Sequence, residues 1–219
     1  MADVKSTKPT RRYHSPVREE NARRTRRALV AAATKLFVAN GYTATSLADV
    51  AAAAGVARPT VTAAFGTKPA LLRQVLDEAL AGDDAPVPVA ERPWYRPVRE
   101  ADTQSGVIDA YADVCMLIGG RTAAIFETVR RAADTGPEVG EVWATLLRNR
   151  RFGAYAVVER LRSLGDPLRQ GDDVERAADV VWFFNDPAHY AALVLHAGWT
   201  PEEFRAWLAT QMRAALLTG

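Results

Sequence analysis

The sequence predicts an all-α protein, with three helices in a small N-terminal part and a larger helical C-terminal part. Apolar residues recur at spacings of three and four along most of the chain. Residues that cap helices precede many of these stretches, and neither alternating strand patterns nor hairpin turns are found in the sequence.

Length and composition are those of an ordinary globular protein. The 219 residues suffice for one large domain or two smaller ones, and 48% hydrophobic with 25% charged residues excludes disordered and collagen-like chains. The sequence lacks a run of about 18 uncharged apolar residues, so we expect no membrane contact. The N-terminal residues form no apolar leader, and the single cysteine, Cys115, has no intramolecular partner, so we expect a cytoplasmic protein.

Charge divides the chain into two parts. Through Ala70, twelve lysines and arginines face four acidic residues, a net charge of +8, whereas the remainder carries −6. A basic segment beside an acidic one is typical of a polyanion-binding module joined to a second domain. We expect a disordered basic arm over residues 1–17, a polyanion-binding domain over 18–66 and a second domain over 67–219.

The first predicted helix starts at Arg18 and ends at Gly41, and its apolar face is formed by Ala28, Leu29, Ala32, Leu36 and Phe37. Ser46 with Asp49 makes a capping box, which predicts the start of a second helix that Gly55 interrupts.

Pro59 opens a third short helix that ends at Phe65, because proline is tolerated in a first helical turn. Thr67 caps a fourth helix, which runs to Gly82. Four prolines within Asp83–Gln104 predict a linker or loop.

The remaining chain predicts further helices separated by breaks. Gly119-Gly120 is expected to separate two of them. Asp186-Pro187 and Thr200-Pro201 each place a capping side chain before a first-turn proline. The predicted helices cover Ser105–Ile118, Arg121–Ala133, Pro137–Leu164, Asp172–Phe184, Pro187–His196 and Pro201–Leu217.

Two short helices joined by a glycine turn form a DNA-reading helix-turn-helix when the second helix can enter the major groove. Ala51 lies four residues before Gly55, so a small side chain allows a close crossing and the glycine supplies a left-handed turn. We expect a small apolar core of Val50, Ala54, Val56 and Val61. Facing DNA would be Arg58, Pro59, Thr60, Thr62 and Ala63.

These motifs resemble the N-terminal domain of TetR-family transcriptional regulators. The resemblance covers roughly Arg26 to Leu76, and its motifs are Gly41-Tyr42-Thr43-Ala44-Thr45-Ser46-Leu47-Ala48-Asp49-Val50-Ala51, Ala54-Gly55-Val56, Phe65-Gly66-Thr67-Lys68 and Leu71-Leu72. The later helices, and the ending around Gly198-Trp199-Thr200-Pro201, are similar in layout to the family's ligand-binding and dimerisation domain.

The resemblance implies a homodimer that binds a palindromic operator in double-stranded DNA and releases it when a small-molecule effector occupies the C-terminal domain. We expect a repressor, because occluding a promoter needs no further machinery. The expected DNA contacts come from Arg26, Thr45, Ser46, Arg58, Pro59, Thr60, Thr62, Ala63 and Lys68.

The recognition helix departs from the family pattern. Thr62 and Ala64 stand where the family carries an aromatic residue and a His or Tyr that touch phosphates, and Pro69-Ala70 replaces an acidic helix start. Threonine hydroxyls can still bind phosphates or base edges. Compensating phosphate contacts are expected from the basic side chains upstream, for which a solvated surface is the alternative: Arg11, Arg12, Arg18, Arg23, Arg24, Arg26 and Arg27.

Enzyme and metal signatures are lacking, so we expect neither catalysis nor a cofactor. His14, His189 and His196 have no partners at metal-ligand spacing, and Cys115 has no sequence-readable base. Ordinary packing is the better interpretation of these side chains.

The C-terminal part has enough aromatic residues for an apolar pocket. We expect Tyr111, Cys115, Trp143, Phe152, Tyr155 and Trp182 to bind a mainly hydrophobic effector, with ordinary core packing as the alternative for each. The helix Val174–Phe184 is apolar nearly all round, so we expect it to form a four-helix dimer interface with the helix carrying Phe204, Trp207, Leu208, Met212 and Leu216. The alternative is a helix at the centre of a monomeric bundle.

Two other functions stay open. One is a small-molecule-binding protein or enzyme with a vestigial DNA-binding domain, which the altered recognition helix favours. The other is a non-specific nucleic-acid-binding protein, which the basic arm favours. The salt dependence and sequence preference of DNA binding distinguish the three.

Overall fold

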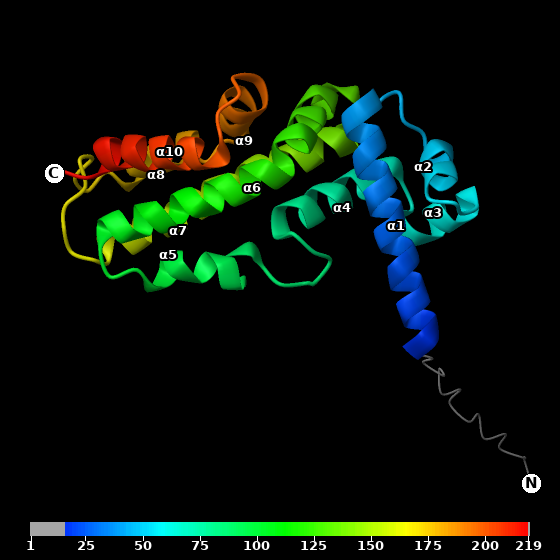
Figure 1. The fold of residues 1–219 in the computed structure, drawn as a ribbon, viewed down its shortest axis with the longest axis horizontal. Helices are drawn as coiled ribbons and strands as arrows, with labels where there is room; N and C mark the ends of the chain where they lie inside the picture. Colours follow the sequence, from blue (N-terminus) through cyan, green and yellow to red (C-terminus); the bar gives the residue numbers. More distant parts are fainter. Residues whose placement is uncertain (1–15, 219) are drawn as a thin grey trace, which may run out of the picture.

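The computed structural model describes residues 16–218 as a helical molecule (Figure 1). Strands are absent from this range, in which only one antiparallel bridge joins Leu168 to Leu217. The all-α prediction is confirmed. None of the helices in this range is long and apolar enough to cross a bilayer.

Ten α-helices are present in the described range, together with three 3-10 turns and one π-helical turn, η4. The α-helices are α1 Pro16–Asn40, α2 Leu47–Ala53, α3 Arg58–Phe65, α4 Lys68–Ala81, α5 Arg96–Glu100, α6 Gln104–Ala132, α7 Pro137–Arg162, α8 Val174–Phe184, α9 Pro187–Tyr190 and α10 Pro201–Leu216. The turns are η1 Val89–Glu91, η2 Pro93–Tyr95, η3 Ala133–Thr135 and η4 Ala191–His196. The predicted arm over 1–17 lies outside the described residues except for its last two, which already belong to α1.

Local capping signals place several helix starts where the sequence predicts them. The Ser46 hydroxyl oxygen accepts from Asp49 N at 3.1 Å, and Ser46 N donates to Asp49 Oδ2 at 2.8 Å. Thr200 and Glu203 form the same reciprocal box at the start of α10. Each box pairs backbone N–H groups that the helix itself leaves free.

The predicted break at Gly119-Gly120 is wrong, because α6 continues through both glycines. A Cβ atom on Gly119 would lie 2.8 Å from Cβ and Cγ of Tyr190 in α9. These glycines therefore allow a neighbouring helix to approach closely, and packing overrides their low helix propensity.

The segment over 83–104 is more ordered than the predicted linker. It contains η1, η2 and α5, and it buries Tyr95 and Val98 against the C-terminal core. Arg92, which is also buried, donates to Asp83 and to the carbonyl oxygens of Ala85 and Val87. The prolines exclude one long helix, but these contacts fold the segment onto α6.

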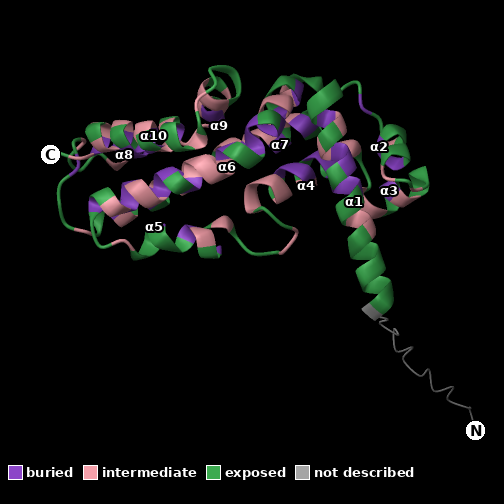
Figure 2. Ribbon diagram, viewed as in Figure 1, coloured by how far each residue is buried: buried purple, intermediate pink, exposed green. Residues whose placement is uncertain are grey.

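Two hydrophobic cores lie at opposite ends of the long helices α6 and α7. Figure 1 shows α1–α3 at the end away from the C-terminus, and Figure 2 shows buried residues on the facing sides of the helices. The N-terminal core joins α1–α4 to Ile125, Phe126 and Val129 of α6 and to the first half of α7. The C-terminal core joins the rest of α6 and α7 to α5, α8, α9 and α10.

The expected dimer surface needs a correction at α10. Four of its five proposed interface side chains are buried in the core of the same chain, namely Phe204, Leu208, Met212 and Leu216. Only Trp207 stays partly exposed. On α8, Ala177, Ala178 and Val181 also face inward, whereas Phe183 is 56% exposed.

Candidate functional site

Helices α2 and α3 form the predicted helix-turn-helix. Val50 and Val61 are fully buried between the helices, and Ala54 and Val56 pack against them, as the sequence predicts. Gly55 adopts a φ of 67°, which favours glycine in the turn.

The outer face of this unit carries free polar groups. Arg58, Pro59, Thr62 and Ala63 of α3 are exposed, and Thr60 is half-buried. Within residues 16–218, the side chains of Arg58 and the two threonines make no hydrogen bond, so their donors are available to an external partner. Ser46 is also exposed, although its side chain caps α2.

Three residues that were predicted to contact DNA make internal hydrogen bonds in the structure. Arg26 donates to the carbonyl oxygen of Ala64 and to Gln74 Oε1, both at 2.8 Å, and its guanidinium lies 4.3 Å from the Phe65 ring centroid. Thr45 is only 1% exposed, and its hydroxyl donates to the carbonyl oxygens of Leu36 in α1 and of Gly41. A DNA contact by either side chain would have to replace these bonds.

Lys68 is the third of these residues. Its Nζ donates to the carbonyl oxygens of Tyr42 at 2.9 Å and Thr45 at 3.0 Å, and it lies 4.1 Å from the Tyr42 ring centroid. Partial burial lowers the pKa of this ammonium. Lys68 therefore fastens the start of α4 to the turn before α2.

A cavity of about 880 Å³ lies between α4, the segment after it, α6, α7 and the α8–α9 junction. Tyr111, Cys115 and Phe152 line it, as three of the six predicted ligand residues. Its wall also includes Val87 and the 77% exposed Phe152, so the cavity reaches the surface. A volume of this size accommodates a drug-sized molecule.

A polar network forms one part of the cavity wall. The Arg150 side chain is only 8% exposed, and its Nε and Nη2 donate to Asn185 Oδ1 at 3.1 and 3.0 Å. Asn185 Nδ2 donates to the Tyr111 hydroxyl at 3.0 Å, and Asp186 lies 3.0 Å from Arg150 Nη1. The wall therefore holds a fixed guanidinium that is paired with the Asp186 carboxylate.

Burial keeps the Tyr111 and Cys115 side chains of this wall neutral. It raises the pKa of Cys115 to about 12 and holds the pKa of Tyr111 well above its usual value. The Cys115 thiol is thus protonated near neutral pH and is a poor nucleophile. Desolvation lowers the pKa of Arg150, and the nearby Asp186 carboxylate opposes this shift.

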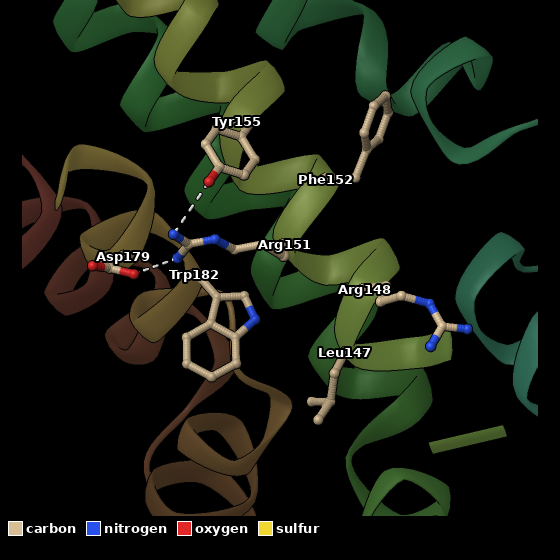
Figure 3. Close-up of a pocket in the computed structure, with 7 residues that line it drawn as sticks. All are labelled: Leu147, Arg148, Arg151, Phe152, Tyr155, Asp179 and Trp182. Carbon is tan, nitrogen blue, oxygen red and sulfur yellow. Dashed lines mark hydrogen bonds and ion pairs between the residues drawn. The ribbon is translucent and has the colours of Figure 1, made fainter. Parts of the chain in front are cut away.

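The other predicted ligand residues lie elsewhere. Tyr155 and Trp182 line a smaller hollow of about 550 Å³ between α7 and α8, where Arg151 donates to Tyr155 and pairs with Asp179 (Figure 3). The Phe152 ring lies on the side of α7 away from Trp182 in this view. Trp143 lines neither hollow, because it packs edge-on against Phe126 at 5.1 Å in the N-terminal core.

Comparison with known families decides the nature of the N-terminal unit. Residues 29–75 match the family model described as bacterial regulatory proteins, tetR family. The chain carries a TetR-family DNA-binding domain. The search of curated proteins gave no match.

Solved TetR-type structures share the fold over most of the chain. NalD, the secondary repressor of the MexAB-OprM multidrug efflux pump in Pseudomonas aeruginosa, is 18% identical with a TM-score of 0.66, and 91% of this chain and 98% of NalD are covered. SmeT, solved in complex with triclosan, is 19% identical with a TM-score of 0.67 over 88% and 91% of the two chains. TylP, a TetR regulator from Streptomyces fradiae, is 21% identical with a TM-score of 0.61 over 88% and 86%.

The sequence did not reveal several residues of the cavity wall. The cavity residues Arg150, Asn185 and Asp186 were not predicted, and Asp186-Pro187 was interpreted only as a helix start. An arginine beside the apolar stripe of α7 is a weak signal for a buried cation. Two positions of α3 depart from the TetR pattern. Thr62 is exposed, whereas Ala64 is half-buried and its carbonyl oxygen accepts a hydrogen bond from Arg26.

Proposed function

We propose that this protein is a ligand-responsive transcriptional repressor, which binds a palindromic operator as a homodimer and is released by a small, mainly hydrophobic molecule. One observation carries the proposal: α4 lines the 880 Å³ cavity, and only two residues separate it from α3. A molecule that displaces α4 therefore also moves the DNA-reading helix.

The mechanism depends on the distance between the two α3 helices of a dimer. Successive major grooves on one face of DNA are about 34 to 36 Å apart, so both helices fit only at that spacing. A ligand that prefers another position of α4 shifts the population toward a spacing that DNA does not match. It does so only to the extent that its affinity differs between the two states.

The cavity supports a ligand with an apolar body and one polar end. Its aromatic and aliphatic lining suits the body, and the network of Arg150, Asn185 and Tyr111 suits a hydrogen-bonding group. Hydrogen bonds to such a fixed polar cluster set orientation, while apolar burial supplies most of the affinity.

Selection from a random duplex pool tests DNA recognition. The selected duplex and a scrambled version are then compared by fluorescence anisotropy across a salt series. A strong preference for one palindrome supports the regulator. Equal, weak binding to both duplexes that disappears at modest salt would indicate a non-specific nucleic-acid-binding protein, and no binding at low salt would indicate a small-molecule binder or enzyme.

Screening apolar compounds for release of the selected duplex tests the effector site. Cys115→Trp fills the cavity and is expected to abolish release while DNA binding persists. Ala206→Trp places the same bulk on the exposed face of α10 and serves as the control. Unchanged release by the Cys115 variant would contradict the cavity as the effector site.

A further inference from the structure

Two arginines of α1 converge on one carboxylate after α4. Arg23 Nε and Nη2 donate to Asp84 Oδ2 and Oδ1, both at 2.8 Å. Arg27 Nε and Nη2 donate to the same two oxygens at 3.0 and 2.8 Å. Each carboxylate oxygen therefore accepts from both guanidinium groups, and we call this cluster the Asp84 clasp.

The clasp lies beside the DNA-reading unit. Arg26, between the two arginines in sequence, bonds the carbonyl oxygen of Ala64 in the last turn of α3. The side chains of Arg23 and Arg27 remain 50% and 52% exposed, whereas that of Asp84 is only 10% exposed. The two cations are therefore open to a partner from solvent on the side away from the carboxylate.

The geometry suits a phosphate group as well as it suits Asp84. A guanidinium binds two oxygens of a carboxylate or of a phosphate through the same planar fork. Two arginines on one aspartate leave one positive charge in excess. Glu20 of α1 also raises the pKa of both arginines, and Asp83, the neighbour of Asp84, is paired with Arg92.

We propose that Arg23 and Arg27 form a phosphate-binding site for the DNA backbone, and that Asp84 occupies this site when DNA is absent. The inference rests on the proposed DNA-binding function. Asp84 acts as an internal competitor, so DNA gains the two phosphate contacts only after breaking the clasp. The exchange weakens binding to every duplex and carries no sequence preference.

The clasp also ties DNA binding to the cavity. Asp83, Asp84 and Val87 all line the cavity wall, so a molecule seated there lies against the segment that carries the carboxylate. A molecule bound in the cavity can therefore open or close the clasp, as DNA can.

Asp84→Asn tests the competition directly. The probes are a fluorescein-labelled random-sequence 30-base-pair duplex and the duplex from the selection above. Asp102→Asn removes the same charge from an exposed site that forms no ion pair with the other described residues. Relative to this control, the Asp84 variant is expected to bind both duplexes roughly two- to thirtyfold more tightly, the value of two exposed ion pairs. The slope of log affinity against log salt should steepen by up to about 1.8.

Neutralising both arginines distinguishes phosphate binding at this site from an effect of the protein's total charge. Arg23→Gln with Arg27→Gln is expected to flatten the salt slope of the Asp84→Asn protein by up to about 1.8 and to remove its gain in affinity. Arg99→Gln with Arg169→Gln removes two exposed cations elsewhere and should do neither. Circular dichroism confirms that each variant folds.

Three outcomes would overturn the inference. If wild type binds DNA but Asp84→Asn matches Asp102→Asn in affinity and slope, the clasp is not a competitor, although the proposed function survives. If Asp84→Asn binds more weakly, the clasp instead holds a geometry that DNA binding requires. If all folded variants fail to bind either duplex at 50 mM salt, both proposals are wrong.

Discussion

At the scale of single residues, Ser46 decides where the DNA-reading unit begins. Its hydroxyl and the Asp49 carboxylate satisfy backbone N–H groups at the start of α2. Ser46→Ala is expected to lower the free energy of unfolding by about 1 kcal/mol, the usual value of a helix cap. Urea denaturation measures the change, with Ser105→Ala at an exposed serine as the control. Equal stability of the two variants would contradict the role of the cap.

Cys115 reports on the cavity through its reactivity. Burial raises its pKa to about 12, so little thiolate exists at pH 8. Iodoacetamide is expected to label the native protein more than roughly a hundredfold more slowly than the urea-unfolded protein. Because the folded pKa is raised, the native rate should continue to climb tenfold per pH unit to about pH 10. A rate that levels off near pH 9 would indicate an unshifted thiol.

Single-residue signals differ in how far they reach along the chain. The caps at Ser46, Thr67 and Thr200 are predictable because each involves residues three positions apart. The clasp is not, because Arg23 and Asp84 are 61 residues apart and neither position has a local signature. The sequence predicts that these cations bind a polyanion, but it does not reveal the carboxylate to which they are bonded in the folded protein.

At the scale of elements, α6 continues through the adjacent Gly119 and Gly120 without breaking. Gly119→Ala is expected to destabilise the protein by about 1 to 3 kcal/mol, because the added Cβ meets Tyr190 at 2.8 Å. Gly153→Ala in α7 meets no atom within 4 Å and should stabilise the protein by up to about 1 kcal/mol through helix propensity. Thermal or urea unfolding of both variants measures whether the two substitutions change the stability in opposite directions. Equal effects would contradict close packing of α9 on α6.

The same helix shows why element boundaries were partly unpredictable. Glycine propensity favours a break at 119–120, but the energetic benefit of packing α9 appears only in the folded molecule. Four prolines likewise exclude a long helix over 83–104, yet they do not reveal the buried Arg92 that folds the segment. Periodicity and capping predicted most other helix limits to within a few residues.

At the scale of the whole molecule, the outer face of α8 is the remaining candidate for the dimer interface. Phe183 is exposed there, whereas the proposed α10 side chains are mostly internal. Phe183→Glu is expected to sediment as a 23.8 kDa monomer under conditions in which wild type sediments at twice that mass. Val38→Glu, at an exposed apolar residue of α1, should leave the dimer intact. A wild-type monomer at all concentrations would exclude palindromic recognition by a dimer.

The proposed effector site belongs to this scale because its residues come from several helices. Periodicity identified aromatic residues on α6, α7 and α8, but their distribution between a cavity, a surface hollow and a core depends on how the helices cross. Tyr111, Cys115 and Phe152 therefore line the cavity, whereas Trp143 does not. The sequence therefore predicts that aromatic side chains line a pocket, but it does not predict which of them do so.

The length of α6 has a consequence for building hybrid regulators. This helix spans about 43 Å and contributes side chains to both hydrophobic cores. A fusion joined directly after α3 would leave α1 of the exchanged head against a foreign α4 and foreign residues at 125–146, where the N-terminal core continues into α6 and α7. A biosensor with an exchanged DNA-reading head therefore needs the matching surface of α6 and α7 to be transplanted with it.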